Sequence, residues 1–211
     1  MLHIQTLIVG QLQTNCHLVW DTESMEAILI DPGDDASYIA DTVVRLALRP
    51  KAIVATHGHF DHTLAAFELQ HIFDIPFYVH PKDEFLLSQM RQTAEHYLSV
   101  SVIELPPIPS PDLQAATRVS VGSHEFHIIE TPGHTPGGIS LYSEKDGVCF
   151  TGDTVFEGGA IGDWRHSYSD KQALLSSVQT LLSLPDATIL YPGHGRESSV
   201  TMEKHAQKGK M

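Results

Sequence analysis

The sequence has few of the residues that mark nucleic-acid-binding, secreted or membrane proteins. Its 13 lysines and arginines stand against 26 aspartates and glutamates, which gives a formal charge of -13. Because nucleic-acid binding depends on basic patches, we expect no nucleic-acid partner. No run approaches the roughly 20 apolar residues of a membrane span, and the first residues do not resemble a signal peptide. We therefore expect a cytoplasmic, soluble protein with no membrane association.

Cysteine is also scarce. The two cysteines, Cys16 and Cys149, lie in separate apolar runs, and the sequence has no Cys-x-x-Cys pair. This pattern indicates neither a zinc ribbon nor a disulfide framework, and we predict that both thiols are buried as small hydrophobic groups. The one basic cluster, formed by Lys204, Lys208 and Lys210, lies in a tail that we expect to be frayed.

Histidine, in contrast, is plentiful, with 14 in the chain. Residues 56–62 read Thr-His-Gly-His-Phe-Asp-His and place three imidazoles and a carboxylate within six positions. An apolar run at 51–55 predicts a buried strand before this segment, and residues 64–69 have a helical pattern after it. Side chains two positions apart in an extended turn point the same way, so His57 and His59 can bind one ion. Asp61 and His62 are better placed to hold a second.

The remaining pattern predicts an α/β fold of two similar halves, at about 1–104 and 112–211, within a single domain covering 1–211. In the first half we expect strands at 4–9, 17–20, 27–30, 51–55 and 75–79, and helices at 36–47, 64–69 and 81–98. In the second half we expect strands at 124–130, 139–142, 148–150 and 188–191, and a helix at 171–184. Four prolines within 105–111 predict a stiff connector that is neither helix nor central strand.

The same motif recurs where the predicted strands end. Four apolar strands stop at a glycine-containing turn that carries histidine or aspartate, at 57–62, His134, Asp153 and His194. Glycine permits the unusual backbone angles and close approach that ligand positions require. Imidazole and carboxylate are preferred ligands of divalent metals, so these endings predict one metal site assembled from four strand ends.

With these motifs, the sequence resembles the metallo-β-lactamase-fold hydrolases, and among them the small glyoxalase II-like enzymes. The resemblance extends from Thr14-Asn15-Cys16 to Tyr191-Pro192-Gly193-His194. It implies an αββα four-layer sandwich, with two mixed sheets face to face and a dinuclear centre at one edge. It also implies which side chains hold the metals: His57, His59 and His134 the first, Asp61, His62 and His194 the second, and Asp153 both.

The resemblance implies a hydrolase of thioesters, or of other esters and lactones. Two divalent ions lower the pKa of a shared water to about 7 and give a bridging hydroxide nucleophile. Asp61 and Asp153 are the expected catalytic carboxylates. Zinc is the metal expected first, and iron or manganese would also accept these nitrogen and oxygen ligands.

One alternative has a different chemistry. In the related persulfide dioxygenases a single iron occupies the positions of His57, His134 and Asp153. A second set of ligands, Asp61, His62 and His194, favours two metals over a single iron. A third possibility is a metal-binding module without catalysis, which would require the loss of a ligand, and all seven ligand positions are filled. Metal analysis separates these possibilities.

The expected substrate is a small molecule, and the sequence leaves its identity and the oligomeric state open. The candidate substrate contacts lie in the segment that follows Asp153: Trp164, Arg165, His166 and Tyr168. Glutathione-thioester enzymes of this family have a basic residue where this chain has Asp163, and a carboxylate there should repel an anionic peptide. The chain ends soon after His194, so we also expect no carboxy-terminal helical domain of the larger glyoxalase II enzymes.

Overall fold

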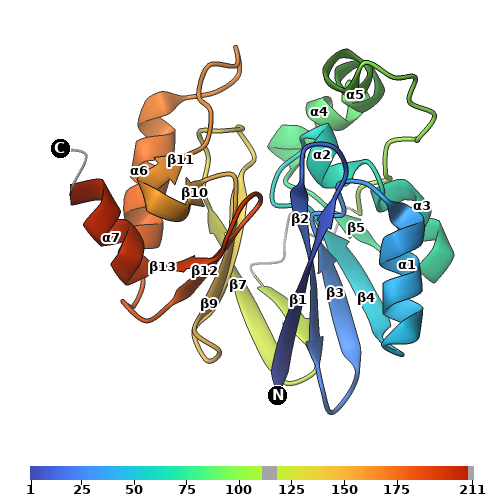
Figure 1. Ribbon diagram of the computed structural model, residues 1–211, viewed down its shortest axis with the longest axis horizontal. Helices are drawn as coiled ribbons and strands as arrows, with labels where there is room; N and C mark the ends of the chain where they lie inside the picture. Colours follow the sequence, from blue (N-terminus) through green and yellow to red (C-terminus); the bar gives the residue numbers. More distant parts are fainter. Residues whose placement is uncertain (111–117, 209–211) are drawn as a thin grey trace.

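The computed structural model describes residues 1–110 and 118–208, which form two mixed β-sheets that pack face to face (Figure 1). The first sheet has the order β1-β2-β3-β4-β5, in which β3, β4 and β5 are parallel and the other neighbours antiparallel. Its strands are β1 (Leu2–Val9), β2 (Thr14–Asp21), β3 (Glu26–Ile30), β4 (Arg49–Val54) and β5 (Phe77–Tyr78).

The second sheet has the order β13-β12-β9-β8-β7-β6, with only β9 and β12 parallel among its neighbours. Its strands are β6 (Arg118–Val121), β7 (His124–Glu130), β8 (Ile139–Ser143), β9 (Val148–Gly152), β12 (Ile189–Pro192) and β13 (Ser198–Ser199). A small separate hairpin consists of β10 (Val155–Phe156) and β11 (Ala160–Ile161), joined by the 3-10 turn η3 (Glu157–Gly159).

Helices cover the outer face of each sheet (Figure 1). The first sheet is covered by α1 (Ala36–Arg45) and α3 (Ala66–Phe73), and the second by α6 (Lys171–Leu182) and α7 (Val200–Lys208). Above the first sheet lie α2 (Phe60–Thr63), η1 (Pro81–Asp83), α4 (Glu84–Ser88) and α5 (Met90–Leu98). This is the αββα four-layer sandwich, so the predicted fold class is confirmed.

Strand β3 shows why the layers form. Ile28 and Ile30 pack in the core between the sheets, whereas Ala27 and Leu29 pack toward α1 and α3. Side chains alternate between the faces of a strand, and a strand that is buried on both faces is apolar throughout. The continuous run Ala-Ile-Leu-Ile therefore specifies a strand covered on both sides.

Several expected elements differ from the structure. The single helix expected over 81–98 is divided into η1, α4 and α5, because Asp83 and Gln89 both have ψ of 0°. The helix expected at 64–69 begins later, at Ala66, and Phe60–Thr63 forms a separate turn of helix. Strands β6 and β13 and the β10–β11 hairpin were not expected.

The prediction of a frayed tail was wrong, because the chain forms α7 from Val200 to Lys208. The side chain of Glu203 points inward, with the residue only 1% exposed, and accepts hydrogen bonds from the backbone N–H groups of Gly158 and Gly159. These bonds fix a helix whose own sequence is polar. Lys210 lies outside the described residues.

The proline-rich connector is described up to Ser110, and its last proline lies outside the described residues. Residues 105–110 have no helix, as predicted. Pro109 forms an isolated parallel bridge with Phe77 at the edge of the first sheet, where a residue without an N–H is tolerated. Ser110 N–H donates to the Phe77 carbonyl at 2.7 Å. The division into halves stays a prediction.

Both cysteines are free and buried, as predicted. Among the helices of residues 1–110 and 118–208, none is long and apolar enough to cross a bilayer.

Candidate metal centre

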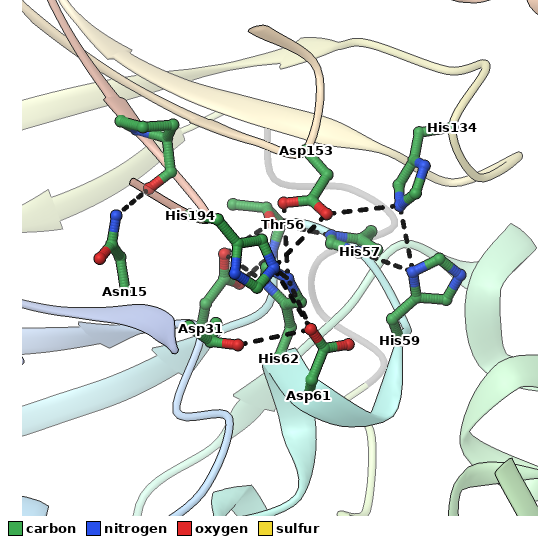
Figure 2. Close-up of polar contacts among 12 residues, drawn as sticks. Asn15, Asp31, Thr56, His57, His59, Asp61, His62, His134, Asp153 and His194 are labelled. Carbon is green, nitrogen blue, oxygen red and sulfur yellow. Dashed lines mark hydrogen bonds and ion pairs between the residues drawn. The ribbon is translucent and has the colours of Figure 1, made fainter. Parts of the chain in front are cut away.

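Four strand ends bring histidines and aspartates to one edge of the sandwich. Strands β7, β9 and β12 run in the same direction in the second sheet, so the loops after them leave from one edge. These loops carry His134, Asp153 and His194. Residues 56–62 follow β4 of the facing sheet and meet them there (Figure 2). The structure therefore brings together all seven side chains predicted as metal ligands.

The first group of donors consists of three ring nitrogens. His57 Nε2 lies 3.1 Å from His59 Nδ1, and His134 Nε2 lies at the same distance from that atom. The three donor atoms all lie within 4.8 Å of one another. The predicted pairing of His57 with His59 on one ion therefore has the geometry it needs, and His134 supplies a third donor from the facing sheet.

The second group contains Asp61, His62 and His194. His194 Nε2 lies 3.3 Å from Asp61 Oδ2 and 3.3 Å from His62 Nε2. Phe60–Thr63 is a single helical turn, so Asp61 and His62 turn away from the extended segment that holds His57 and His59. This change of backbone conformation divides one short motif between two groups.

Asp153 lies between the two groups (Figure 2). Its Oδ2 atom is 3.6 Å from His134 Nε2 and 3.7 Å from His194 Nε2, and its Oδ1 atom is 3.5 Å from His62 Nε2. Oδ1 is buried and has no hydrogen-bond partner among the described residues. A buried carboxylate oxygen without a donor is costly, so this atom fits a site for a cation.

The protonation of two rings of the first group also fits a metal. Burial, together with the charge of neighbouring imidazoles, lowers the pKa of His57 and of His59 well below the ordinary value. Both rings are therefore neutral near pH 7, which is the form that binds a metal. With nitrogens and carboxylate oxygens only, the seven donors suit zinc, iron and manganese.

The pKa of His62 is shifted in the opposite direction, upward. Burial lowers the pKa of its imidazole, but three surrounding carboxylates outweigh burial and raise that pKa to about 10. These carboxylates belong to Asp61, Asp153 and Asp31. Without metal, a proton on His62 thus balances part of the negative charge in the cluster. A divalent cation bound at Nε2 would replace that proton.

Asp31 holds the outer side of the His62 ring and was not predicted to take part. Its Oδ2 atom lies 3.0 Å from His62 Nδ1. Thr56 fixes this carboxylate by donating its backbone N–H to Oδ1 at 2.6 Å and its hydroxyl to Oδ2 at 2.7 Å. A carboxylate on the outer nitrogen of a histidine orients the ring and leaves the other nitrogen for a metal.

Asp83 is a second residue that sequence reasoning missed. Its fully buried carboxylate accepts hydrogen bonds from Gly58 N–H at 3.0 Å, Thr135 Oγ1 at 2.7 Å and Gly137 N–H at 2.6 Å. These donors belong to the two loops that carry His59 and His134. Asp83 therefore fixes the two halves of the first group relative to each other. Its position at the start of an expected helix gave no local signal of this role.

The outer nitrogens of two rings of the first group, His59 and His134, are also occupied. His59 Nε2 lies 2.8 Å from the Tyr168 hydroxyl, and His134 Nδ1 lies 2.8 Å from the Asp163 carbonyl oxygen. Both contacts direct the inner nitrogen of the ring toward the cluster. The loop after β11 thus positions the first group from outside.

The last strand end is fixed from the other sheet. The Asn15 side chain donates to the carbonyl oxygens of Pro192 and Gly195, both at 2.9 Å. At Gly193 a Cβ atom would overlap Asp153 Oδ1 and lie 2.6 Å from His62 Cε1. Only glycine lets the backbone pass this close to the cluster. The motifs at both ends of the sequence therefore meet at the site.

A cavity of about 380 Å³ opens beside the cluster. Donor residues from both groups form one side of it, and side chains of α2, α4 and α5 form another. His166 and Tyr168 also line it, and their rings are stacked with centroids 5.2 Å apart. A volume of this size suits a small molecule.

Two of the four candidate substrate contacts lie elsewhere. Trp164 and Arg165 are not among the described lining residues of this cavity. Trp164 packs beneath Lys171, and Arg165 pairs with Asp163 through two contacts of 2.7 and 2.8 Å. Arg165 holds the pKa of the Asp163 carboxyl well below its usual range, so the carboxylate stays ionised beside a charge of opposite sign. The repulsion expected from Asp163 is therefore weakened, and substrate binding by all four residues stays a prediction.

Comparison with known proteins places this geometry in a family. Residues 9–194 match the profile of the metallo-beta-lactamase superfamily. The chain is 35% identical over 212 residues to hydroxyacylglutathione hydrolase GloC of Haemophilus influenzae, covering 97% of this chain and 96% of that protein.

Two solved structures have the same fold. The crystal structure of TTHA1623 in a di-iron-bound form has a TM-score of 0.85 at 31% identity and covers 96% of this chain and 98% of that one. The crystal structure of BLEG-1 B3 metallo-beta-lactamase has a TM-score of 0.83 at 29% identity, with 96% and 97% covered. The chain therefore belongs to the metallo-β-lactamase superfamily, whose metallo-hydrolases bind divalent metal ions.

Proposed function

We propose that this chain is a glyoxalase II-like hydrolase that cleaves thioesters with two divalent metal ions. The observation that carries the proposal is the place of Asp153, whose carboxylate lies within 3.7 Å of donor atoms from both groups of three. Two groups that share one carboxylate suit a pair of neighbouring cations. That pair is the arrangement used by two-metal hydrolases.

When bound, such a pair supplies a water with a pKa of about 7 and positive charge beside the carbonyl oxygen of the substrate. The residues of this chain hold and orient that centre. Asp61 and Asp153 provide its negative charge, and Thr14 Oγ1 lies 3.4 Å from Asp61 Oδ2 and steadies that carboxylate. Asp31 keeps His62 turned with Nε2 inward.

Tyr168 adds a contact with the substrate. Burial raises the pKa of its phenol to about 12, so the hydroxyl stays protonated at neutral pH. If His59 Nε2–H donates to the phenol oxygen, the phenol proton remains available to an acceptor in the cavity. The proposed role of Tyr168 is to donate that proton in a hydrogen bond to the substrate.

A thioester suits this site because a thiolate leaves with little help from a general acid. No cysteine nucleophile is needed, and burial raises the pKa of the Cys16 and Cys149 thiols far above the neutral range. The relative named as a hydroxyacylglutathione hydrolase supports a thioester substrate. The relative crystallised in a di-iron-bound form supports two metals, with iron beside zinc as a candidate.

The alternative function, a persulfide dioxygenase, needs one iron at His57, His134 and Asp153. The second group is complete, with all three donor atoms within 4.8 Å of one another, which favours two metals and hydrolysis. The likeness to a protein named a B3 metallo-β-lactamase makes a β-lactam a further substrate to assay.

The test is metal analysis combined with a substrate panel. Protein purified without chelators is analysed for metal and assayed with S-lactoylglutathione, acyl-coenzyme A thioesters, lactones and a β-lactam. We expect two divalent ions per chain and the highest kcat/KM on a thioester. One iron per chain, with oxygen uptake on a persulfide, would replace the proposal with the dioxygenase.

A further inference from the structure

We propose that the cavity beside the metal centre binds an uncharged, apolar acyl group. The enzyme would then prefer thioesters of medium-length fatty acids to those of short polar acids. This inference rests on the proposed function and adds a substrate class to it.

The first observation is the apolar wall of the cavity. Six of its described lining side chains are apolar or aromatic: Leu12, Phe60, Leu86, Met90, Tyr97 and Tyr168. The rings of Phe60 and Tyr97 are stacked with their centroids 5.9 Å apart. Leu12 and Tyr97 remain 41% and 57% exposed, so apolar surface continues from the cavity to solvent. Such a surface gains free energy when a hydrocarbon chain covers it.

The second observation is the charge of the cavity. Its described lining residues include no lysine or arginine, whereas Asp61, Asp153 and Asp163 all line it. Arg165 is paired with Asp163, and Arg91 at the start of α5 donates its Nε–H to the Val102 carbonyl at 3.0 Å. Apart from the metal ions themselves, nothing described in the cavity wall therefore offers an ion pair to an anionic group.

The chemistry of thioesters decides which half of the substrate fits. In glutathione and coenzyme A the thiol half carries negative charges, which need cations or water around them. The acyl half is the half that can be apolar. We therefore assign the acyl chain to the cavity and the thiol half to the solvent-exposed side of the cluster.

The direct test uses a series of acyl groups on one neutral thiol. The dimetal enzyme is assayed with acetyl, butyryl, hexanoyl and octanoyl thioesters of N-acetylcysteamine. We expect kcat/KM to rise by up to about fourfold for each methylene until the cavity is filled. Values that stay constant or fall with chain length would overturn the inference while leaving thioester hydrolysis in place. Hydrolysis of none of these thioesters would instead remove the proposed function.

A charge introduced into the wall provides a second test. Gln89, directly before α5, is exposed and lines the cavity, whereas Gln92, within α5, is exposed and does not belong to the described lining. We expect Gln89→Lys to lower kcat/KM for the octanoyl thioester and to raise it by about fivefold for an acyl group that ends in a carboxylate. Gln92→Lys, the matched control, should change neither value. Equal effects of the two variants would contradict the assignment.

Binding gives a readout that needs no catalysis. Inert S-octyl and S-butyl thioethers of N-acetylcysteamine are titrated into the metal-loaded protein by calorimetry. We expect the octyl compound to bind at least tenfold more tightly and Gln89→Lys to reduce this difference. Equal affinity for the two thioethers would overturn the inference.

Discussion

The Oδ2 atom of Asp31 lies 3.0 Å from Nδ1 of His62, on the side of the ring that faces away from the other donors of the cluster. This contact gives His62 two different sides, one held by a carboxylate and one directed to the site. A single residue outside the predicted ligand set thus orients the ring of a predicted ligand.

We predict that Asp31→Asn weakens metal binding by about 10- to 100-fold, because an amide cannot stabilise a proton on His62 Nδ1 as a carboxylate does. Competition with a chromophoric chelator measures the affinity. Asp41→Asn, which changes an exposed aspartate of α1, is the control and should bind metal as the unaltered protein does. Unchanged affinity in Asp31→Asn would show that the contact does not orient the ligand.

The raised pKa of His62 predicts proton release on metal binding. With a pKa of about 10 in the metal-free protein, this ring is protonated at pH 7.5, and a metal at Nε2 must displace the proton. Zinc titrations in buffers of different ionisation enthalpy should report about one proton released from this ring. Affinity should accordingly rise with pH up to about 10.

The raised pKa of His62 also determines whether the metal-free protein gains or loses stability as the pH rises. A folded-state pKa above the unfolded value of 6.5 means that the protonated ring stabilises the fold. That contribution is complete below pH 6.5 and is lost as the pH rises through about 10. Urea unfolding of the metal-free protein at pH 6.5 and pH 10 should show this loss, and Asp31→Asn should reduce it. Equal loss in both proteins would assign the effect to other groups.

Tyr168→Phe tests whether the hydroxyl or the ring of this residue matters. Loss of the 2.8 Å contact with His59 Nε2 should lower metal affinity about tenfold, and KM should rise if the hydroxyl also donates to substrate. Tyr97→Phe removes a hydroxyl from another residue that lines the cavity and should leave metal affinity unchanged. An equal change in both variants would point to a general effect on the cavity.

Asp83→Ala should lower the free energy of unfolding by about 3 kcal/mol, because it leaves three buried donors without their acceptor. Urea denaturation measures the change. Asp186, whose carboxylate is exposed and pairs with Lys204, provides the control, and Asp186→Ala should have little effect. A small change in Asp83→Ala would mean that Gly58 and Thr135 find other partners.

Asp153→Ala should reduce kcat by on the order of 100-fold or more, since it removes the carboxylate placed between both groups. Asp61→Ala should have an effect of the same order. Circular dichroism checks that each variant keeps the fold. A kcat near that of the unaltered protein, with a full metal complement in both variants, would contradict the proposed roles of these carboxylates.

The seven donors could be predicted because each follows a local pattern, an apolar strand that ends at a glycine turn with histidine or aspartate. The order of strands and helices in each half predicted two sheets packed face to face, and the family resemblance implied the four layers. Asp31 and Asp83 could not be predicted in this way. Their partners are distant in sequence, and locally they read as a turn residue and a helix start.

Helix α7 was missed for a similar reason. Its sequence is polar, and the bonds of Glu203 to Gly158 and Gly159 come from a distant loop. The placement of Trp164 and Arg165 outside the cavity likewise depends on their pairing with Lys171 and Asp163. Contacts between distant segments determined these features, and local patterns did not encode them.

The central claim is that the cluster holds two metal ions that share Asp153. Anomalous diffraction from crystals of the metal-loaded protein, collected at the absorption edge of the bound metal, tests it most directly. We expect two peaks, one among His57, His59 and His134, the other among Asp61, His62 and His194, with the Asp153 carboxylate between them. A single peak in the first group at full loading would contradict it.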